Sequence, residues 1–166
     1  MLRHLLRGTA AGATGTAALN IATYMDIAIR GRAASQVPEK VAGALTQSVG
    51  IPLEAEAQSS GNARDDEKAK AQHRLSGLGA LMGYVTGLGI GAIYGLVRPL
   101  FGRRVSVPLA GLALGAAAMA SSDVPATVIG ATNPRTWSAS SWASDIIPHA
   151  IYGLVMAMTY ESYASK

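Results

Sequence analysis

The sequence predicts an all-α, polytopic membrane protein with four transmembrane helices and a helical loop outside the membrane. Three features support this fold class: long segments without charge, many small residues, and glycines repeated at helical spacing. Only 14% of the 166 residues are charged, against about 25% in a typical soluble protein. The chain length corresponds to a single membrane domain, residues 1–166.

Four segments contain no Asp, Glu, Lys or Arg, and they hold 18, 23, 18 and 15 residues. A helix rises about 1.5 Å per residue and the hydrocarbon core is about 30 Å thick, so a span needs about 20 residues. Polar residues dilute the first expected span, and the fourth is short. The four expected spans are residues 8–29, 75–97, 105–122 and 146–160.

The alternative to a membrane protein is a soluble helical bundle with a glycine-rich core. The chain contains 31 Ala and 19 Gly, and glycine costs about 1 kcal/mol per helical position in water. Five glycines in one helix are difficult to sustain there, whereas small residues are common where transmembrane helices meet. A cleaved signal or transit peptide is the less favoured alternative for residues 1–18, because residues 8–18 are too weakly apolar.

The second expected span has a glycine at every fourth position, a pattern known as a glycine zipper. Each step of four overshoots a full helical turn by about 40°, so the stripe drifts around the helix and predicts a right-handed crossing near −40°. Shorter glycine pairs occur in the other spans. Either a neighbouring helix or a second copy of the chain fits against such a stripe. The expected packing glycines are Gly79, Gly83, Gly87, Gly91, Gly95, Gly111, Gly115 and Gly153.

A six-residue sequence occurs twice, at residues 92–97 and 150–155, in the second and fourth expected spans. Gly8-xxx-Gly12 and Gly111-xxx-Gly115 occur in the first and third spans. This repetition predicts that the first two spans form one helical hairpin and the last two form a second, similar hairpin. Chance similarity in a chain of low complexity is the alternative.

The loop at residues 30–74 carries helix signals of its own. Pro38 and Glu39 after Ser35 predict a helix start, and Gly50-Ile51-Pro52 predicts the end of that helix. The charged residues 65–70 predict the solvent-exposed first turns of a helix that continues into the second span. Before the fourth span, Asn133-Pro134 predicts a turn, and Ser144 with Asp145 predicts an N-cap. Four spans place both termini on one side, which we expect to be the cytoplasm.

Ionisable and amide side chains inside a membrane are costly, so each is a functional candidate. Asn20 lies in the middle of the first span, and Asp26 lies near its end with Arg30 one turn further on. In the fourth span, His149 lies one turn after Asp145, and Tyr152 follows. Each of these residues has two interpretations. They either form hydrogen bonds and ion pairs between helices, or they form a proton or cation site.

The sequence offers little for catalysis. Cysteine is absent, the three histidines are scattered, and neither a nucleophile elbow nor a phosphate-binding loop occurs. We therefore expect no enzymatic activity, no metal and no cofactor. The net charge of +4 suggests nucleic acid, but the charges lie in loops rather than in one basic patch, so we expect no nucleic-acid partner.

Several short motifs occur along the chain: residues 17–20, Tyr24-x-Asp26, Arg30-Gly-Arg32, residues 74–79, residues 134–138, Ser144-Asp145 and Pro148-His149-x-x-Tyr152-Gly153. Together they resemble uncharacterised small four-helix membrane proteins of actinobacteria, and this resemblance covers most of the chain. The stretch His-x-x-Tyr-Gly in the last helix is more distantly similar to bacterial inner-membrane proteins of the YagU type, which implies a loose link to acid tolerance. Neither resemblance implies an established activity.

Taken together, these features predict a small protein of the bacterial inner membrane with a non-enzymatic accessory, structural or envelope-stress role. Its expected partners are the lipid bilayer and either a second copy or another membrane protein. The alternative is a small proton- or cation-linked transporter or channel, in which Asn20, Asp26 and His149 line a polar path. Convergence of these three side chains on one cavity would favour transport, and their dispersion into packed helix contacts would favour the structural role.

Overall fold

The computed structural model describes residues 1–51, 53 and 62–164, and all regular elements in these ranges are helical. The all-α prediction is therefore confirmed for the described part of the chain. The elements are α1 (Leu2–Arg30), α2 (Val37–Ser48), α3 (Asn62–Val97), η1 (Arg98–Arg104), α4 (Val107–Val128), η2 (Pro134–Thr136) and α5 (Ala139–Ala164), of which η1 and η2 are 3₁₀ helices.

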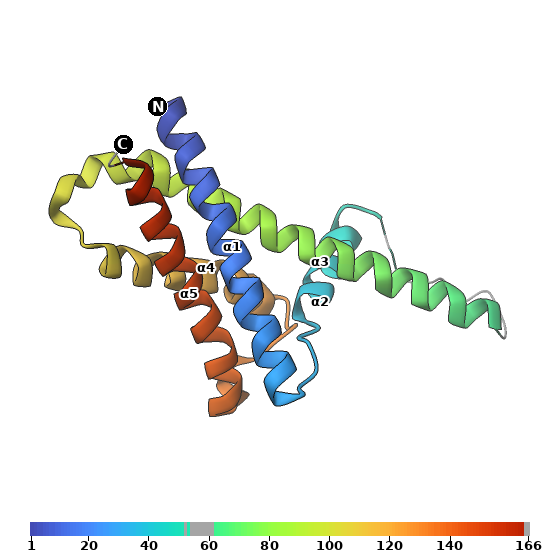
Figure 1. Ribbon diagram of the computed structural model, residues 1–166. Coiled ribbons are helices and arrows are strands. Elements are labelled where there is room, and N and C mark those ends of the chain that lie inside the picture. The colour runs from blue at the N-terminus through green and yellow to red at the C-terminus, as the bar shows by residue number, and fades with distance from the viewer. Residues whose placement is uncertain (52, 54–61, 165–166) are drawn as a thin grey trace.

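The helices pack in the order α3, α1, α5, α4. Helix α1 contacts both α3 and α5, and α5 contacts α4. The start of α1 and the end of α5 lie at the same end of the bundle, while α3 crosses α1 obliquely and its first half projects beyond the other helices (Figure 1). Helices α1 and α5 therefore lie side by side, with α3 packed against α1 and α4 packed against α5 on the far side of this pair in Figure 1.

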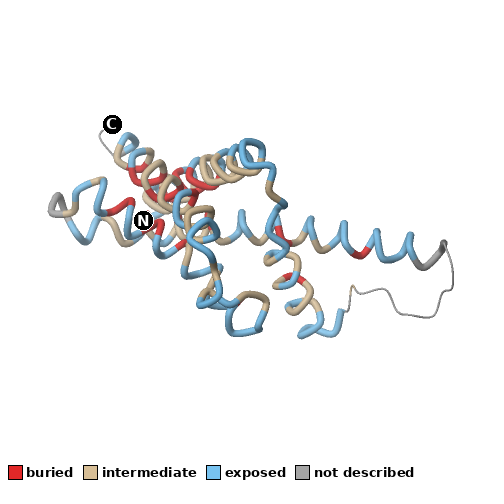
Figure 2. Tube along the Cα trace, turned by 90° about the horizontal axis from the view of Figure 1, so that it is seen from below, coloured by how far each residue is buried: buried red, intermediate tan, exposed pale blue. Residues whose placement is uncertain are grey.

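The buried core is small and lies where α1, α4 and α5 meet (Figure 2). Its three largest fully buried side chains, those of Tyr152, Met156 and Tyr160, all come from α5. The remaining members are small or medium-sized, since closely approaching backbones leave little room for side chains. The core cluster is Ala11, Ala110, Leu114, Ala118, Tyr152, Met156, Ala157 and Tyr160.

Two helical stretches are long and apolar enough to cross a membrane: Asp65–Phe101, which continues from α3 into η1, and Val107–Val128, which is α4. Only 17% and 28% of their most apolar 18-residue windows are buried. The central helix of a soluble protein would bury most of such a window. The other two expected spans lie within α1 and α5, which do not meet the same criterion among the described residues.

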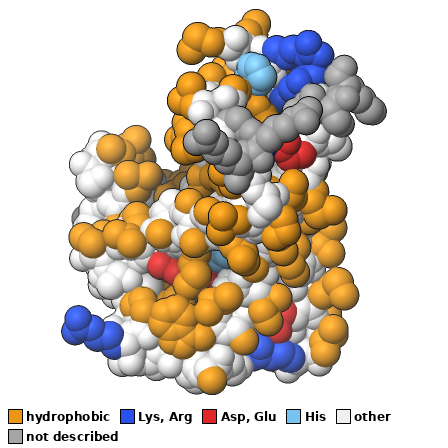
Figure 3. Space-filling model, turned by 90° about the vertical axis from the view of Figure 1, so that its left-hand side faces the viewer, with side chains coloured by type: hydrophobic (Ala, Val, Ile, Leu, Met, Phe, Trp, Pro, Cys, Tyr) orange, Lys and Arg blue, Asp and Glu red, His pale blue; other side chains and the backbone are white. Residues whose placement is uncertain are grey.

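The outward-facing surface of the bundle is rich in apolar side chains. Figure 3 shows them from top to bottom of one face, with Lys and Arg confined to its upper and lower margins. Leu112 of α4 is 56% exposed and Met158 of α5 is 61% exposed. A few acidic side chains lie among these apolar patches (Figure 3), and exposed apolar patches are typical of surfaces that contact a membrane or another protein.

The structure corrects the predicted boundaries of the last two spans. Helix α5 begins at Ala139, so the prediction that Ser144 and Asp145 form its N-cap is wrong. Ser138 caps the helix instead, because its hydroxyl oxygen accepts the backbone N–H of Ser141 at 3.1 Å. Helix α4 continues beyond residue 122 to Val128, which places Asp123 inside a helix.

The loop predictions are confirmed where the structure describes them. The Asn133 side chain accepts the backbone N–H of Arg135 at 3.2 Å and initiates η2. The charged residues 65–70 belong to α3, where the Lys70 ammonium donates to Glu67 at 2.8 Å and lowers the pKa of that carboxyl.

Helix α2 begins at Val37, close to the predicted start. It ends at Ser48, two residues before Gly50 adopts a left-handed φ of 76°. The predicted helix break included Pro52, which lies outside the described residues.

Candidate functional site

Three of the five α3 glycines form a close contact with α1. Gly87, Gly91 and Gly95 face Gly8 and Gly12 so closely that a Cβ atom on Gly91 would lie 2.7 Å from the Gly12 Cα atom. Real Cβ atoms essentially never approach other atoms within 3.0 Å. The two helices therefore touch through their backbones, which is how glycine repeats bring helices together in membranes.

The other two zipper glycines have different surroundings. Gly79 lies against Pro38 of α2, where an added Cβ would lie 2.9 Å from the proline Cβ. Nothing lies within 4 Å of an added Cβ on Gly83. The glycines of α3 thus contact two helices, α1 and α2, and one of them, Gly83, contacts neither. This is expected because successive glycines in the repeat are rotated by about 40° around the helix. This packing within the chain means that a second copy is not needed to cover Gly87, Gly91 and Gly95.

Helices α4 and α5 meet through a second glycine contact. A Cβ on Gly153 would lie 3.0 Å from the Gly111 carbonyl carbon, and one on Gly115 would lie 2.6 Å from the His149 carbonyl oxygen. Helices α1 and α3 therefore form one pair, and α4 and α5 form another. Gly91 lies between Gly8 and Gly12 as Gly153 lies between Gly111 and Gly115. The repeated six-residue sequence aligns Gly153 with Gly95 rather than with Gly91. The α4–α5 contact is therefore shifted by one helical turn relative to the α1–α3 contact.

Two tyrosines of α5 connect the pairs. The Tyr152 hydroxyl donates to the Gly87 carbonyl oxygen at 2.8 Å, and the Tyr160 hydroxyl donates to the Gly95 carbonyl oxygen at 3.2 Å. His4 Nδ1 lies 3.1 Å from the Tyr160 hydroxyl, which accepts from it. The two tyrosines lie eight residues apart in the sequence, and so do the two glycines that they contact. Tyr152, a predicted candidate for a polar site, is thus a buried link between α5 and α3.

Asn20 and Asp26 of α1 lie in separate environments. The Asn20 amide donates to the Tyr84 hydroxyl of α3 at 3.4 Å. The Asp26 carboxylate forms ion pairs with Arg30 at 3.1 Å and with Arg32 at 2.5 Å, and it accepts from the Ser144 hydroxyl of α5 at 3.0 Å. Asp26 therefore ties the end of α1 to the beginning of α5.

Arg30 strengthens the same junction. Its guanidinium donates to the Ser144 hydroxyl at 2.8 Å and also to the hydroxyl of Ser140. Because Asp26 and Arg30 each bond to Ser144 of α5, these charge-assisted hydrogen bonds fix the position of α5 against α1. The Asp26 carboxylate also offsets part of the positive charge of Arg30 and Arg32.

The second polar cluster lies between α4 and α5. His149 Nδ1 lies 2.8 Å from the Asp145 carbonyl oxygen and 3.3 Å from its carboxylate Oδ1. Both neighbours are acceptors, so Nδ1 carries a proton. The Asp123 carboxyl of α4 lies within hydrogen-bonding reach of the Asp145 carboxyl.

The acids of this cluster are close neighbours of one another. Asp145 Oδ2 is buried and has no hydrogen-bond partner in the described structure. Two ionised carboxylates close together repel each other, and a proton shared by such a pair would relieve the repulsion. The three side chains thus form one cluster of titratable groups between α4 and α5. The part of the chain that the structure describes contains no set of three His, Asp or Glu residues arranged to hold a metal ion.

Comparison with family models, with curated proteins and with solved structures finds no match to this chain.

Sequence reasoning identified Asp145 and His149 but missed Asp123, which served only as the end of an uncharged segment. Asp123 becomes a candidate once α4 is known to continue to Val128. An acidic side chain inside an apolar helix is costly and therefore needs a partner. Asn20, Asp26 and His149 do not converge on one cavity in the described structure. They lie in three different helix contacts, namely α1–α3, α1–α5 and α4–α5.

Proposed function

We propose that the chain is a small integral membrane protein in which α1, α3, α4 and α5 all cross the bilayer. The exposed apolar surfaces of α3 and α4 support membrane insertion. In α1, Arg7 and Asp26 are 19 positions apart, which corresponds to about 29 Å of helix, close to the thickness of the hydrocarbon core. Because α1 packs against α3 and α5 packs against α4, a bilayer that surrounds α3 and α4 also contacts the exposed apolar faces of α1 and α5.

The two ends of the bundle carry residues typical of membrane–water interfaces. Trp137 and Trp142 form an edge-to-face pair with ring centres 4.9 Å apart near the start of α5, and Trp is enriched at such interfaces. The opposite end carries Arg3, Arg7 and the arginines of η1. We place this arginine-rich end, with both termini, in the cytoplasm of a bacterial cell.

Within the membrane we propose a non-enzymatic accessory or structural role, with envelope stress as its setting. The observation that carries this proposal is the position of the polar side chains in helix–helix contacts. Asn20, Asp26 and Tyr152 each hydrogen-bond to another helix. Side chains engaged in this way hold the bundle together rather than act on a substrate, and the exposed apolar faces remain available for lipid or a membrane-protein partner.

Cysteine labelling tests the crossing of α1 and α5, because the chain has no native cysteine. Single variants Leu2→Cys, Ala34→Cys, Leu100→Cys, Ala139→Cys and Ser162→Cys are exposed to a membrane-impermeant maleimide in vesicles of known orientation. We expect Leu2→Cys, Leu100→Cys and Ser162→Cys to label from one side, and Ala34→Cys and Ala139→Cys from the other, because Ala139 and Ser162 lie at opposite ends of α5. Labelling of Leu2→Cys and Ala34→Cys from the same side would show that α1 does not cross and would contradict the four-span proposal.

The cluster of Asp123, Asp145 and His149 favours a second candidate function, a proton-linked transporter or channel. An imidazole beside two carboxyl groups that share a proton can pass protons along a short chain of hydrogen bonds. This candidate involves α4 and α5 rather than the predicted path through Asn20 and Asp26.

Dissipation of a pH gradient in proteoliposomes tests this second candidate. If the cluster conducts protons, Asp123→Asn and His149→Gln are each expected to reduce the flux at least tenfold, since each interrupts the hydrogen-bonded chain. Asp65→Asn, an exposed acid at the start of α3, is the matched control and should leave the flux unchanged. Vesicles that remain tight with the unaltered protein would rule out proton conduction and leave the structural role.

A further inference from the structure

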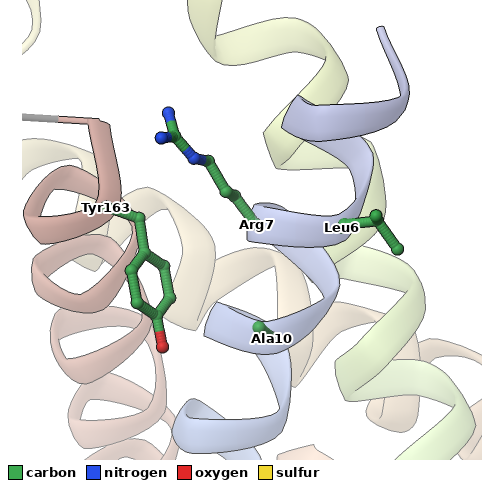
Figure 4. Close-up of a pocket in the computed structure, with 4 residues that line it drawn as sticks. All are labelled: Leu6, Arg7, Ala10 and Tyr163. Carbon is green, nitrogen blue, oxygen red and sulfur yellow. The ribbon is translucent and has the colours of Figure 1, made fainter. Parts of the chain in front are cut away.

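A shallow groove lies between α1 and α5 at the arginine-rich end of the bundle. Its volume is about 290 Å³ and its lining residues are Leu6, Arg7, Ala10 and Tyr163. Figure 4 shows Arg7 and Tyr163 on facing helices with Ala10 below them; the guanidinium points toward the start of α1 and the tyrosine hydroxyl points the opposite way. The groove therefore has a cationic rim and an apolar floor.

The positive charge of this groove is not balanced by an acid. Arg7 forms no ion pair with any side chain that the structure describes. Glu161, the acid on the last turns of α5, is already held by the Arg98 guanidinium at 2.6 Å. Arg3 lies one turn before Arg7 and adds a second cation on the same side of α1.

These features match the chemistry of one kind of occupant. A phospholipid carries its phosphate at the membrane surface and its acyl chains below, which is the order of the Arg7 rim and the apolar floor. Tyr163 is 38% exposed and offers the face of its ring to an acyl chain, whereas the Leu6 side chain extends from the other side of α1 (Figure 4). A second copy of the chain paired across a two-fold axis would bring like charges together, because its own Arg7 would face the same groove.

We propose that this groove binds an anionic phospholipid, with the phosphate on Arg7 and an acyl chain along Ala10 and Tyr163. The inference rests on the proposed membrane location, because only there is the rim at the height of the lipid headgroups. Ala10 is central to the fit, since a larger side chain at this position would fill the groove.

Native mass spectrometry of the purified protein, released from micelles with added phosphatidylglycerol or phosphatidylcholine, tests the proposal. We expect preferential retention of phosphatidylglycerol, and Arg7→Gln should weaken it about fivefold, the effect of one arginine near an anionic surface. Ala10→Leu should weaken retention of the same lipid by filling the floor. Arg135→Gln, which removes an exposed arginine at the opposite end, and Ala17→Leu, at an exposed position two turns further along α1, are the matched controls.

The outcomes separate this inference from the proposed function. Equal retention by the unaltered protein and Arg7→Gln, or an equal loss in Arg135→Gln, would overturn the lipid site. If cysteine labelling nevertheless shows that α1 crosses the membrane, the four-span proposal stands without the site. If α1 does not cross, the proposed function fails independently of any lipid retained.

Discussion

Replacing Gly91 by alanine is expected to separate α1 from α3 and to lower the free energy of unfolding by about 3 kcal/mol, the upper part of the usual range for overpacking. The added Cβ would lie 2.7 Å from the Gly12 Cα atom and 2.9 Å from its nitrogen. Both are backbone atoms, so no side-chain rotation can relieve the overlap. The helices must move apart, and the neighbouring contacts at Gly8 and Gly95 are weakened with them.

Gly83→Ala is the matched control for this experiment, because it makes the same chemical change on the same helix in open space. Reversible unfolding in mixed micelles, followed by circular dichroism, measures both variants. Gly83→Ala should stay within about 0.5 kcal/mol of the unaltered protein, as substitutions away from packed features usually do. Equal stability of the two variants would show that the α1–α3 backbone contact does not stabilise the fold.

Replacing Tyr152 by alanine is expected to lower the free energy of unfolding by about 4 kcal/mol, the range observed for large buried side chains cut to alanine. Tyr152 is 1% exposed and is among the largest fully buried side chains in the described structure. Its ring packs against Gly15 of α1 and its hydroxyl bonds to Gly87 of α3. The substitution therefore leaves a cavity where three helices meet and frees a buried carbonyl group.

Two further tyrosine variants separate the ring from the hydroxyl. Tyr152→Phe keeps the ring and should cost about 1 kcal/mol, the net value of one neutral hydrogen bond. Tyr24→Ala removes a side chain that is 66% exposed and should have little effect on unfolding in the same micelles. A loss in Tyr24→Ala as large as that in Tyr152→Ala would contradict the assignment of the core to α5.

Much of the helical architecture was predictable because it depends on local sequence. Uncharged segments, the Ser35–Glu39 signals and the charged residues 65–70 all lie within helices or at helix starts that the structure contains. Boundaries were harder to predict, as the start of α5 shows. Ser138 and Ser144 are both acceptable N-caps from sequence, and Ser144 is instead engaged by Asp26 of α1.

The candidate site was only partly predictable for the same reason. Asp145 and His149 are one turn apart on a single helix, so their contact follows from helical periodicity. Asp123 reaches them from α4, and the sequence offers no local pattern that links two acids on different helices. The membrane crossing of α1 and α5 and the role of the polar clusters remain predictions for the labelling and flux experiments.

Helix periodicity and the small size of glycine act locally, so the order of residues is enough to predict helices and close glycine contacts. Which glycine meets which helix depends instead on how the helices pack. Gly91 meets α1, Gly79 meets α2 and Gly83 meets nothing, because a stripe drifting by about 40° per step faces each neighbour over only part of its length. The same packing decided that Tyr152 bonds to Gly87 and that Asp123 meets Asp145, since both contacts join different helices.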